Sequence, residues 1–231
     1  MSLRRFIVLF SLLGALLFAW LLWRSSVSSQ QPKITAAPTI IKQPPVIATR
    51  TFDPDNLPAD MPPMIPGELA VTDSNFISDA RVSADVLQLG ATGAMVTVTQ
   101  VTVTLQLTLT MWVPVGATQH VIEHEEGHRQ ISEYFYLNAD KLAARIASTY
   151  MGKQIRVTGT DTHAEISNLL QKLGAEITEE YGKELNPDPT QLRYDDITDH
   201  SRNEVDAKDA VAQALKEAPP VSSPPATNPG N

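Results

Sequence analysis

The sequence of 231 residues predicts an α+β domain in which antiparallel strands come first and helices follow. Apolar residues occupy every odd position from Val101 to Val113, and polar residues fill the positions between them except at Trp112, which is typical of a strand with one buried face. After Gly116 the apolar period becomes that of a helix, and two further helical patterns follow it. A transmembrane helix is expected before the domain, so the chain combines an anchor with one folded unit.

The N-terminus has the pattern of a signal anchor. Arg4 and Arg5 precede an uncharged run from Phe6 to Trp23, and Arg24 closes it. Such a run spans about 27 Å as a helix, which is close to the thickness of the hydrocarbon core. We therefore expect residues 1–24 to anchor the chain in a cell membrane, with the domain on the extracytoplasmic (periplasmic or outer) side. The alternative is a cleaved signal and a secreted protein.

Proline content predicts the domain boundaries. Nine of the 17 prolines lie between Pro32 and Pro66, and five more lie after residue 218. These counts predict a linker at residues 25–66, one domain at residues 67–218 and a disordered tail at residues 219–231. The 26 acidic residues outnumber the 18 basic ones, so nucleic acid is not expected as a partner. The chain has no cysteine, so any metal must bind His, Asp or Glu.

Within the domain, the strand from Val101 to Val113 is preceded by a change of phase at Gln100, which predicts a β-bulge or a tight connection. The helix after Gly116 is expected to continue to about Gly152. A second helix should begin at Thr162. A third is expected from Asp199 to Glu217.

The long first helix contains the pentapeptide His124-Glu125-Glu126-Gly127-His128. Histidines four residues apart lie on one helix face, where both imidazoles can bind one Zn²⁺. Glu125 between them can act as the general base toward water, as in a zinc hydrolase. Gly127 costs about 1 kcal/mol inside a helix, and close packing against the sheet is expected to compensate for it.

A catalytic zinc ion needs a third protein ligand. His200 is one candidate, and Asp195, Glu204 and His163 are alternatives. The segment Tyr194-Asp195-Asp196-Ile197-Thr198-Asp199-His200, together with the His-Glu-x-Gly-His helix, resembles an uncharacterised bacterial family of predicted secreted zinc-dependent proteases.

That resemblance implies a zincin-like motif helix with His124 and His128 as zinc ligands, Glu125 as the base and His200 as the third ligand. Tyr194 is a candidate for stabilising an oxyanion, and Asp195 or Asp199 for orienting a ligand imidazole.

These residues predict a membrane-anchored, extracytoplasmic zinc metalloprotease that hydrolyses a peptide or protein substrate. The strand from Val101 to Val113 is a candidate edge along which an extended substrate pairs. Two alternatives stay open: a catalytically silent zinc-binding protein of the envelope, and a metal-free interaction module. The sequence does not fix the oligomeric state.

Overall fold

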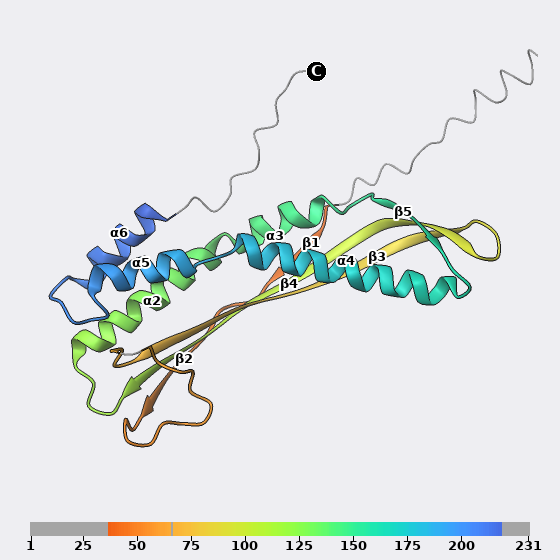
Figure 1. Ribbon diagram of the computed structural model, residues 1–231. Helices are drawn as coiled ribbons and strands as arrows, with labels where there is room; N and C mark the ends of the chain where they lie inside the picture. Colours follow the sequence, from red (N-terminus) through yellow and green to blue (C-terminus); the bar gives the residue numbers. More distant parts are fainter. Residues whose placement is uncertain (1–36, 66, 219–231) are drawn as a thin grey trace, which may run out of the picture. The chain divides into compact units, whose positions relative to one another are not determined.

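The computed structural model describes residues 37–65 and 67–218 and shows a mixed α+β fold (Figure 1), as the sequence predicts. Its sheet contains β1 (Thr39–Lys42), β2 (Val46–Phe52), β3 (Val71–Gln88), β4 (Gly93–Pro114) and β5 (Gln154–Thr158). The helices among these residues are α2 (Gln119–Leu137), α3 (Ala139–Ser148), α4 (Thr162–Glu184), α5 (Asp188–Thr198) and α6 (Ala207–Glu217). None of them has the length and hydropathy that a membrane span needs. The predicted anchor at residues 1–24 and the predicted tail at residues 219–231 lie outside the described residues.

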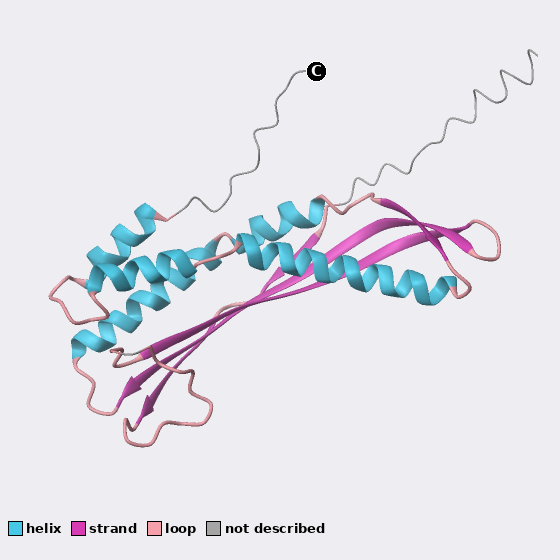
Figure 2. Ribbon diagram, in the orientation of Figure 1, coloured by secondary structure: helices cyan, strands magenta, loops and turns pink. Residues whose placement is uncertain are grey.

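The long strand β4 lies in the middle of the sheet. β3 pairs antiparallel with one edge of β4, from Val71 opposite Trp112 to Gln88 opposite Ala94. Along the other edge, β1 and β2 pair parallel with β4, and β5 pairs antiparallel near its start. The sheet is therefore mixed, and the expectation of antiparallel strands alone is corrected. Figure 2 shows how the long β3–β4 pair twists along its length.

The two parallel strands lie inside residues 25–66, the range that proline content assigned to a linker. β1 and β2 contain no proline themselves, and the prolines of this range that lie nearest to them stand outside their ends, at Pro38, Pro44, Pro45 and Pro54. Such short strands at the edge of a sheet tolerate proline at their ends. The folded unit therefore begins well before Gly67, the boundary expected from the sequence.

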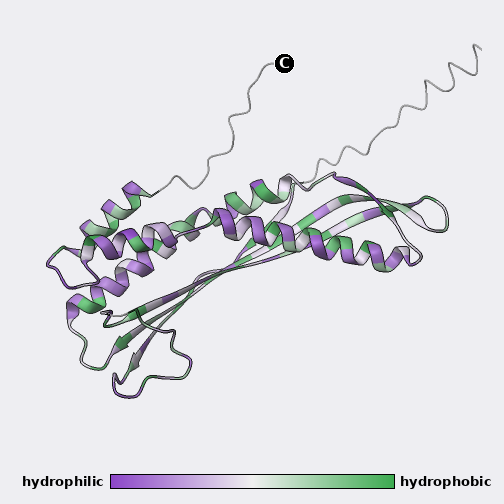
Figure 3. Ribbon diagram, in the orientation of Figure 1, coloured by the Kyte–Doolittle hydropathy of each residue, from purple (hydrophilic) through white to green (hydrophobic). Residues whose placement is uncertain are grey.

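The predicted strand and its bulge are both present in β4. The register shifts opposite Ser83 and Ala84, which pair with Gln100 and Val98, so Thr99 is the extra residue. The apolar residues of β4 from Val98 to Leu107 are buried under the helices and form one core with them, including Val101, Val103, Leu105, Leu107, Ile131, Phe135, Ile146 and Ile177. Helix α4 lies so close to β3 that a Cβ at Gly174 would be 2.5 Å from Ala80 O. Figure 3 shows hydrophobic and hydrophilic residues alternating along the helices, as amphipathic helices require.

The helical region differs from the sequence prediction in two places. The long predicted helix is interrupted at Asn138, which separates α2 from α3. The predicted helix from Asp199 to Glu217 is instead two helices, because α5 ends at Thr198 and α6 begins at Ala207. Asp199 ends α5 in the left-handed conformation, with φ of 47°. The segment Tyr194–Thr198 is therefore the last part of a helix and not a loop before one.

Candidate metal centre

Helix α2 presents two histidines and a glutamate toward the protein interior. The helix begins after Thr118, whose hydroxyl accepts a hydrogen bond from Val121 N at 3.4 Å. One turn later, His124 and Glu125 are only 5% and 3% exposed. His128 follows four residues after His124, so both imidazoles lie on the same face of the helix. The sequence prediction that the two histidines act together is consistent with this placement.

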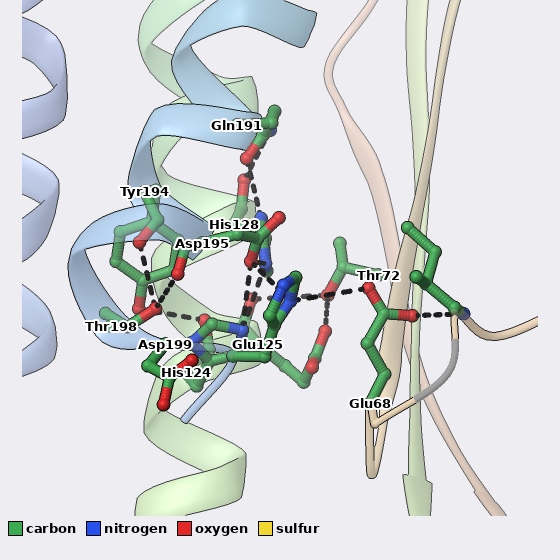
Figure 4. A network of polar contacts seen from close by, with 12 residues as sticks. Glu68, Thr72, His124, Glu125, His128, Gln191, Tyr194, Asp195, Thr198 and Asp199 are labelled. Carbon is green, nitrogen blue, oxygen red and sulfur yellow. Dashed lines mark hydrogen bonds and ion pairs between the residues drawn. The ribbon is translucent and has the colours of Figure 1, made fainter. Parts of the chain in front are cut away.

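The third member of the group is Asp195 on α5 (Figure 4). Its Oδ1 lies 3.3 Å from His124 Nε2 and 3.0 Å from His128 Nε2, and the two Nε2 atoms are 3.2 Å apart. Ligand atoms about 2.0–2.1 Å from a tetrahedral ion are about 3.3 Å from one another. The three atoms therefore already have the spacing of three corners of a tetrahedron. This His-His-Asp group is close enough to hold a metal ion.

Gln191, one turn before Asp195 on α5, fixes the protonation of His128. Its amide nitrogen donates hydrogen bonds to His128 O at 3.2 Å and to Ser132 Oγ at 3.0 Å. Gln191 Oε1 therefore faces His128 Nδ1, 2.7 Å away, and can only accept, so Nδ1 carries the proton. The lone pair of His128 Nε2 then points toward Asp195 and His124. Orienting a ligand imidazole through its other nitrogen is usual in metal sites.

The electrostatics of the group are those of a site for positive charge. Burial alone would raise the pKa of Asp195, but its contacts with His124 and His128 outweigh burial and hold the pKa below the ordinary value. Burial alone would lower the pKa of His128, but its contact with Asp195 outweighs that effect and raises the pKa. Positive charge at this point therefore compensates the buried carboxylate of Asp195. A divalent cation would supply the same compensation to all three ligand atoms at once.

Tyr194 holds the two imidazoles in place. Its ring stacks on His124 with centroids 5.0 Å apart and meets the His128 ring edge-on at 4.9 Å. The hydroxyl donates to His124 O at 3.1 Å, and the side chain is fully buried. A hydroxyl used in this way is not directed at a substrate, so the predicted oxyanion role of Tyr194 does not agree with its contacts. Burial also raises the pKa of Tyr194, which keeps the hydroxyl protonated.

Gly127 is the residue that lets Tyr194 approach α2. A Cβ at Gly127 would lie 2.2 Å from Tyr194 Oη and 2.4 Å from Cζ. The compensation expected for this helical glycine therefore comes from α5 and not from the sheet.

Glu125, the predicted base, is held from the sheet side. Thr72 on β3 donates a hydrogen bond to Glu125 Oε2 at 2.6 Å and contacts Glu125 O at 3.3 Å. Burial raises the pKa of Glu125, although nearby His128 and the Thr72 hydrogen bond oppose the effect. A carboxylate with a raised pKa is a stronger proton acceptor, which is the property that a general base needs.

A cavity of about 350 Å³ opens beside the group, between β3, α2 and the start of α5. Its walls include His124, Glu125, His128 and Asp195, together with the stretch of β3 from Val71 to Ser74. In the part of the chain that the structure describes, β3 pairs only with β4, so its outer edge is free of strand partners. The strand from Val101 to Val113, by contrast, is paired on both edges and offers no edge to a substrate.

The remaining sequence candidates lie in different places. The group that contains His124 and His128 includes Asp195, one of the alternatives considered for the third ligand, and does not include His200. His200 lies beyond it, with Nδ1 3.8 Å from Asp195 Oδ1. His163 and Glu204 are exposed, on the first turn of α4 and in the loop before α6. Asp199 points to Arg202, whose Nη2 donates to Asp199 Oδ1 at 2.7 Å.

Sequence reasoning missed Gln191 and Thr72. Gln191 and Asp195 are four residues apart, the same spacing as the two histidines. That spacing would have singled out Gln191 had the helix been expected to begin at Asp188. Thr72 gives no comparable signal, because it meets Glu125 only through the fold.

Comparison with protein family models, with curated protein sequences and with solved structures finds no match for this chain. The resemblance to predicted secreted zinc-dependent proteases therefore stays a prediction that rests on the two motifs alone.

Proposed function

We propose that this chain is a zinc-dependent peptidase whose metal ligands are His124, His128 and Asp195. The observation that supports it best is the convergence of three ligand atoms, 3.0–3.3 Å apart, beside the buried carboxylate of Glu125. Two imidazoles and one carboxylate, with one side open to a cavity, form a donor set typical of catalytic zinc. Zinc bound there would supply a Lewis acid that activates water and polarises a peptide carbonyl.

The residues of the chain have separate tasks in this proposal. Glu125 accepts a proton from the attacking water and passes it to the leaving amine. Thr72 holds one carboxylate oxygen of Glu125 through its 2.6 Å hydrogen bond and so leaves the other for proton transfer. Gln191 and Tyr194 are positioning residues, because they contact the two imidazoles and the backbone carbonyls of the same histidines.

The free edge of β3 suggests how a substrate lies in the cavity. An extended peptide paired with residues 71–74 would run past His124 and Glu125, which line the same cavity. This replaces β4 as the expected docking strand. With the predicted anchor at residues 1–24, the proposed substrates are peptides or proteins outside the cytoplasm.

The test is the zinc content and peptide hydrolysis of the full-length chain. His128→Ala should lose one zinc ion per chain and all hydrolysis of a peptide mixture followed by mass spectrometry. Glu125→Gln should keep its zinc and lose hydrolysis, whereas the matched control His163→Ala, on the exposed start of α4, should change neither. Zinc without hydrolysis in the wild-type chain would favour a silent zinc-binding protein. No zinc in any variant would favour a metal-free interaction module.

A further inference from the structure

A second group of possible metal ligands lies next to the first and shares Asp195 with it. The group consists of Glu68, Asp195 and His200, whose ligand atoms all lie within 4.8 Å of one another. His200 Nδ1 is 3.8 Å from Glu68 Oε1 and 3.8 Å from Asp195 Oδ1. Glu68 approaches from the loop before β3, and Asp195 approaches from α5 (Figure 4). The loop before β3 and the end of α5 with the loop after it therefore converge on one point.

One buried atom of this group lacks the partner that burial normally requires. His200 Nδ1 is buried and has no hydrogen-bond partner among the described residues, whereas Asp195 Oδ1 faces the Nε2 atoms of His124 and His128. Asp195 as a whole is only 8% exposed. A separation of 3.8 Å is too long for a hydrogen bond. Burying a polar atom without a partner is costly, so His200 Nδ1 calls for a bound group between it and the carboxylates of Glu68 and Asp195.

The spacing of the atoms fits an ion. Three ligands about 2.2 Å from an ion that lies in their plane are about 3.8 Å from one another. The two separations to His200 Nδ1 have this value. Glu68 is already oriented, because its other oxygen accepts a hydrogen bond from Ile65 N at 2.8 Å. An ion would thus replace two long contacts by coordination, without moving the glutamate far.

The loop that carries His200 is held in an unusual conformation. Asp199, His200 and Ser201 have φ of 47°, 53° and 63°, the left-handed region that residues other than glycine rarely adopt. His200 N donates to Asp195 O at 3.2 Å, and Asn203 Nδ2 donates to Ile197 O at 2.9 Å. These bonds fold the loop back on α5 and bring the imidazole to Asp195.

The charge of the cavity also favours a second cation. Its walls contain the carboxylates of Glu68, Asp73, Glu125, Asp188 and Asp195, and none of the described residues that line it is a lysine or an arginine. One divalent ion leaves an excess of negative charge there, which a second ion would reduce.

We propose that Glu68, Asp195 and His200 form a second divalent-cation site, and that Asp195 is shared between this ion and the ion held by His124 and His128. Two carboxylates and one imidazole suit Zn²⁺ or Mn²⁺. The inference rests on the proposed function only through the shared ligand Asp195. In this proposal His200, predicted from the sequence as a ligand of the first ion, binds the second ion instead.

The test counts ions per chain in the full-length protein, stripped with a chelator and reloaded with Zn²⁺ or with Mn²⁺, by elemental analysis and calorimetric titration. The wild-type chain should bind two ions. Glu68→Gln and His200→Asn should each bind one, and so should His128→Ala, which removes the first site. The exposed matched controls Glu123→Gln and His163→Asn should bind two. Thermal melts identify a variant that fails to fold. If either Glu68→Gln or His200→Asn fails to fold, the ion count of the other variant decides the test.

The outcomes separate this inference from the proposed function. A single ion that is lost in His128→Ala and kept in Glu68→Gln overturns the second site and leaves the peptidase proposal standing. A single ion that is lost in Glu68→Gln and kept in His128→Ala overturns the peptidase proposal and leaves the Glu68–Asp195–His200 site standing. A wild-type chain that binds no ion under either condition overturns both.

Discussion

The contact between Gly127 and Tyr194 makes a sharp prediction about the variant Gly127→Ala. In an ordinary helix interior, replacing glycine by alanine stabilises a protein by about 1 kcal/mol. Here the new Cβ would lie 2.2 Å from Tyr194 Oη, 2.4 Å from Cζ and 3.0 Å from Cε1. Tyr194 is fully buried and cannot move away without disturbing the core. Overpacking of this kind costs about 1–3 kcal/mol, so we expect Gly127→Ala to lower the free energy of unfolding by about that amount.

The same substitution should weaken metal binding, because Tyr194 stacks on His124 and donates to its backbone. Denaturant unfolding of the chelator-treated protein measures the first effect, and zinc competition with a chromogenic chelator measures the second. Gly182→Ala is the matched control, since Gly182 also lies in a helix and its Cβ would meet nothing within 4 Å. The control should be stabilised by up to about 1 kcal/mol. Equal stability gains in both variants, with unchanged zinc affinity, would refute the close approach of Tyr194. Combining Gly127→Ala with Tyr194→Leu should recover part of the lost stability but not the zinc affinity.

Three further predictions concern the surroundings of the centre. Gln191→Leu should lower zinc affinity by about 10–100-fold, because His128 loses the hydrogen-bond partner that sets its protonation. The control Gln130→Leu, on the exposed face of α2, should leave zinc affinity unchanged. Equal zinc affinities in the two variants would show that Gln191 does not orient His128. The pKa values of Tyr136 and Tyr181 are raised, mainly by burial, so the stability they contribute is present below pH 10 and lost as pH rises through the folded-state values. Unfolding free energies should therefore fall above pH 10 by up to about 1.4 kcal/mol per pH unit for each tyrosine, and less steeply in Tyr136→Phe; identical slopes would contradict this. Deleting residues 1–52 removes β1 and β2 from the edge of β4 and should give a lower melting temperature than deleting residues 1–36, which keeps both strands. Equal melting temperatures for the two deletions would show that these strands are not part of the folded unit.

The sequence predicts best what a single element encodes by itself. Val101 to Val113 alternates because one strand face is buried, and the bulge at Thr99 follows from the change of phase beside it. His124 and His128 share a face because helical spacing alone places them together. Each of these features needs only local periodicity, so no knowledge of the tertiary fold was required.

The edges of the domain were harder to predict because proline is a weak guide where strands are short. β1 and β2 have four and seven residues, and prolines stand on both sides of each. They are recognisable as strands only through their partner, since Lys42 lies opposite Leu105 and Val46 lies opposite Thr108 in β4. Tyr136 shows how firmly this edge is joined to the core, because its hydroxyl proton is shared between Gln43 O at 2.7 Å and Leu105 O at 3.0 Å.

The third ligand depends on where a helix ends. With a helix expected to start at Asp199, His200 would lie in its first turn and Asp195 in a preceding loop, and the family resemblance implied His200 as the third ligand. With α5 ending at Thr198, Asp195 and Gln191 instead occupy one face of α5. Tyr194 packs closely against α2 at Gly127. That close approach brings the carboxylate within 3.3 Å of both imidazoles. His200 is left one turn beyond, at 3.8 Å from the same oxygen, where an adjacent ion could use it. The left-handed residues after Thr198 determine how α5 ends and where His200 lies. Whether the centre holds one ion or two therefore depends on the geometry of the α5 C-terminus.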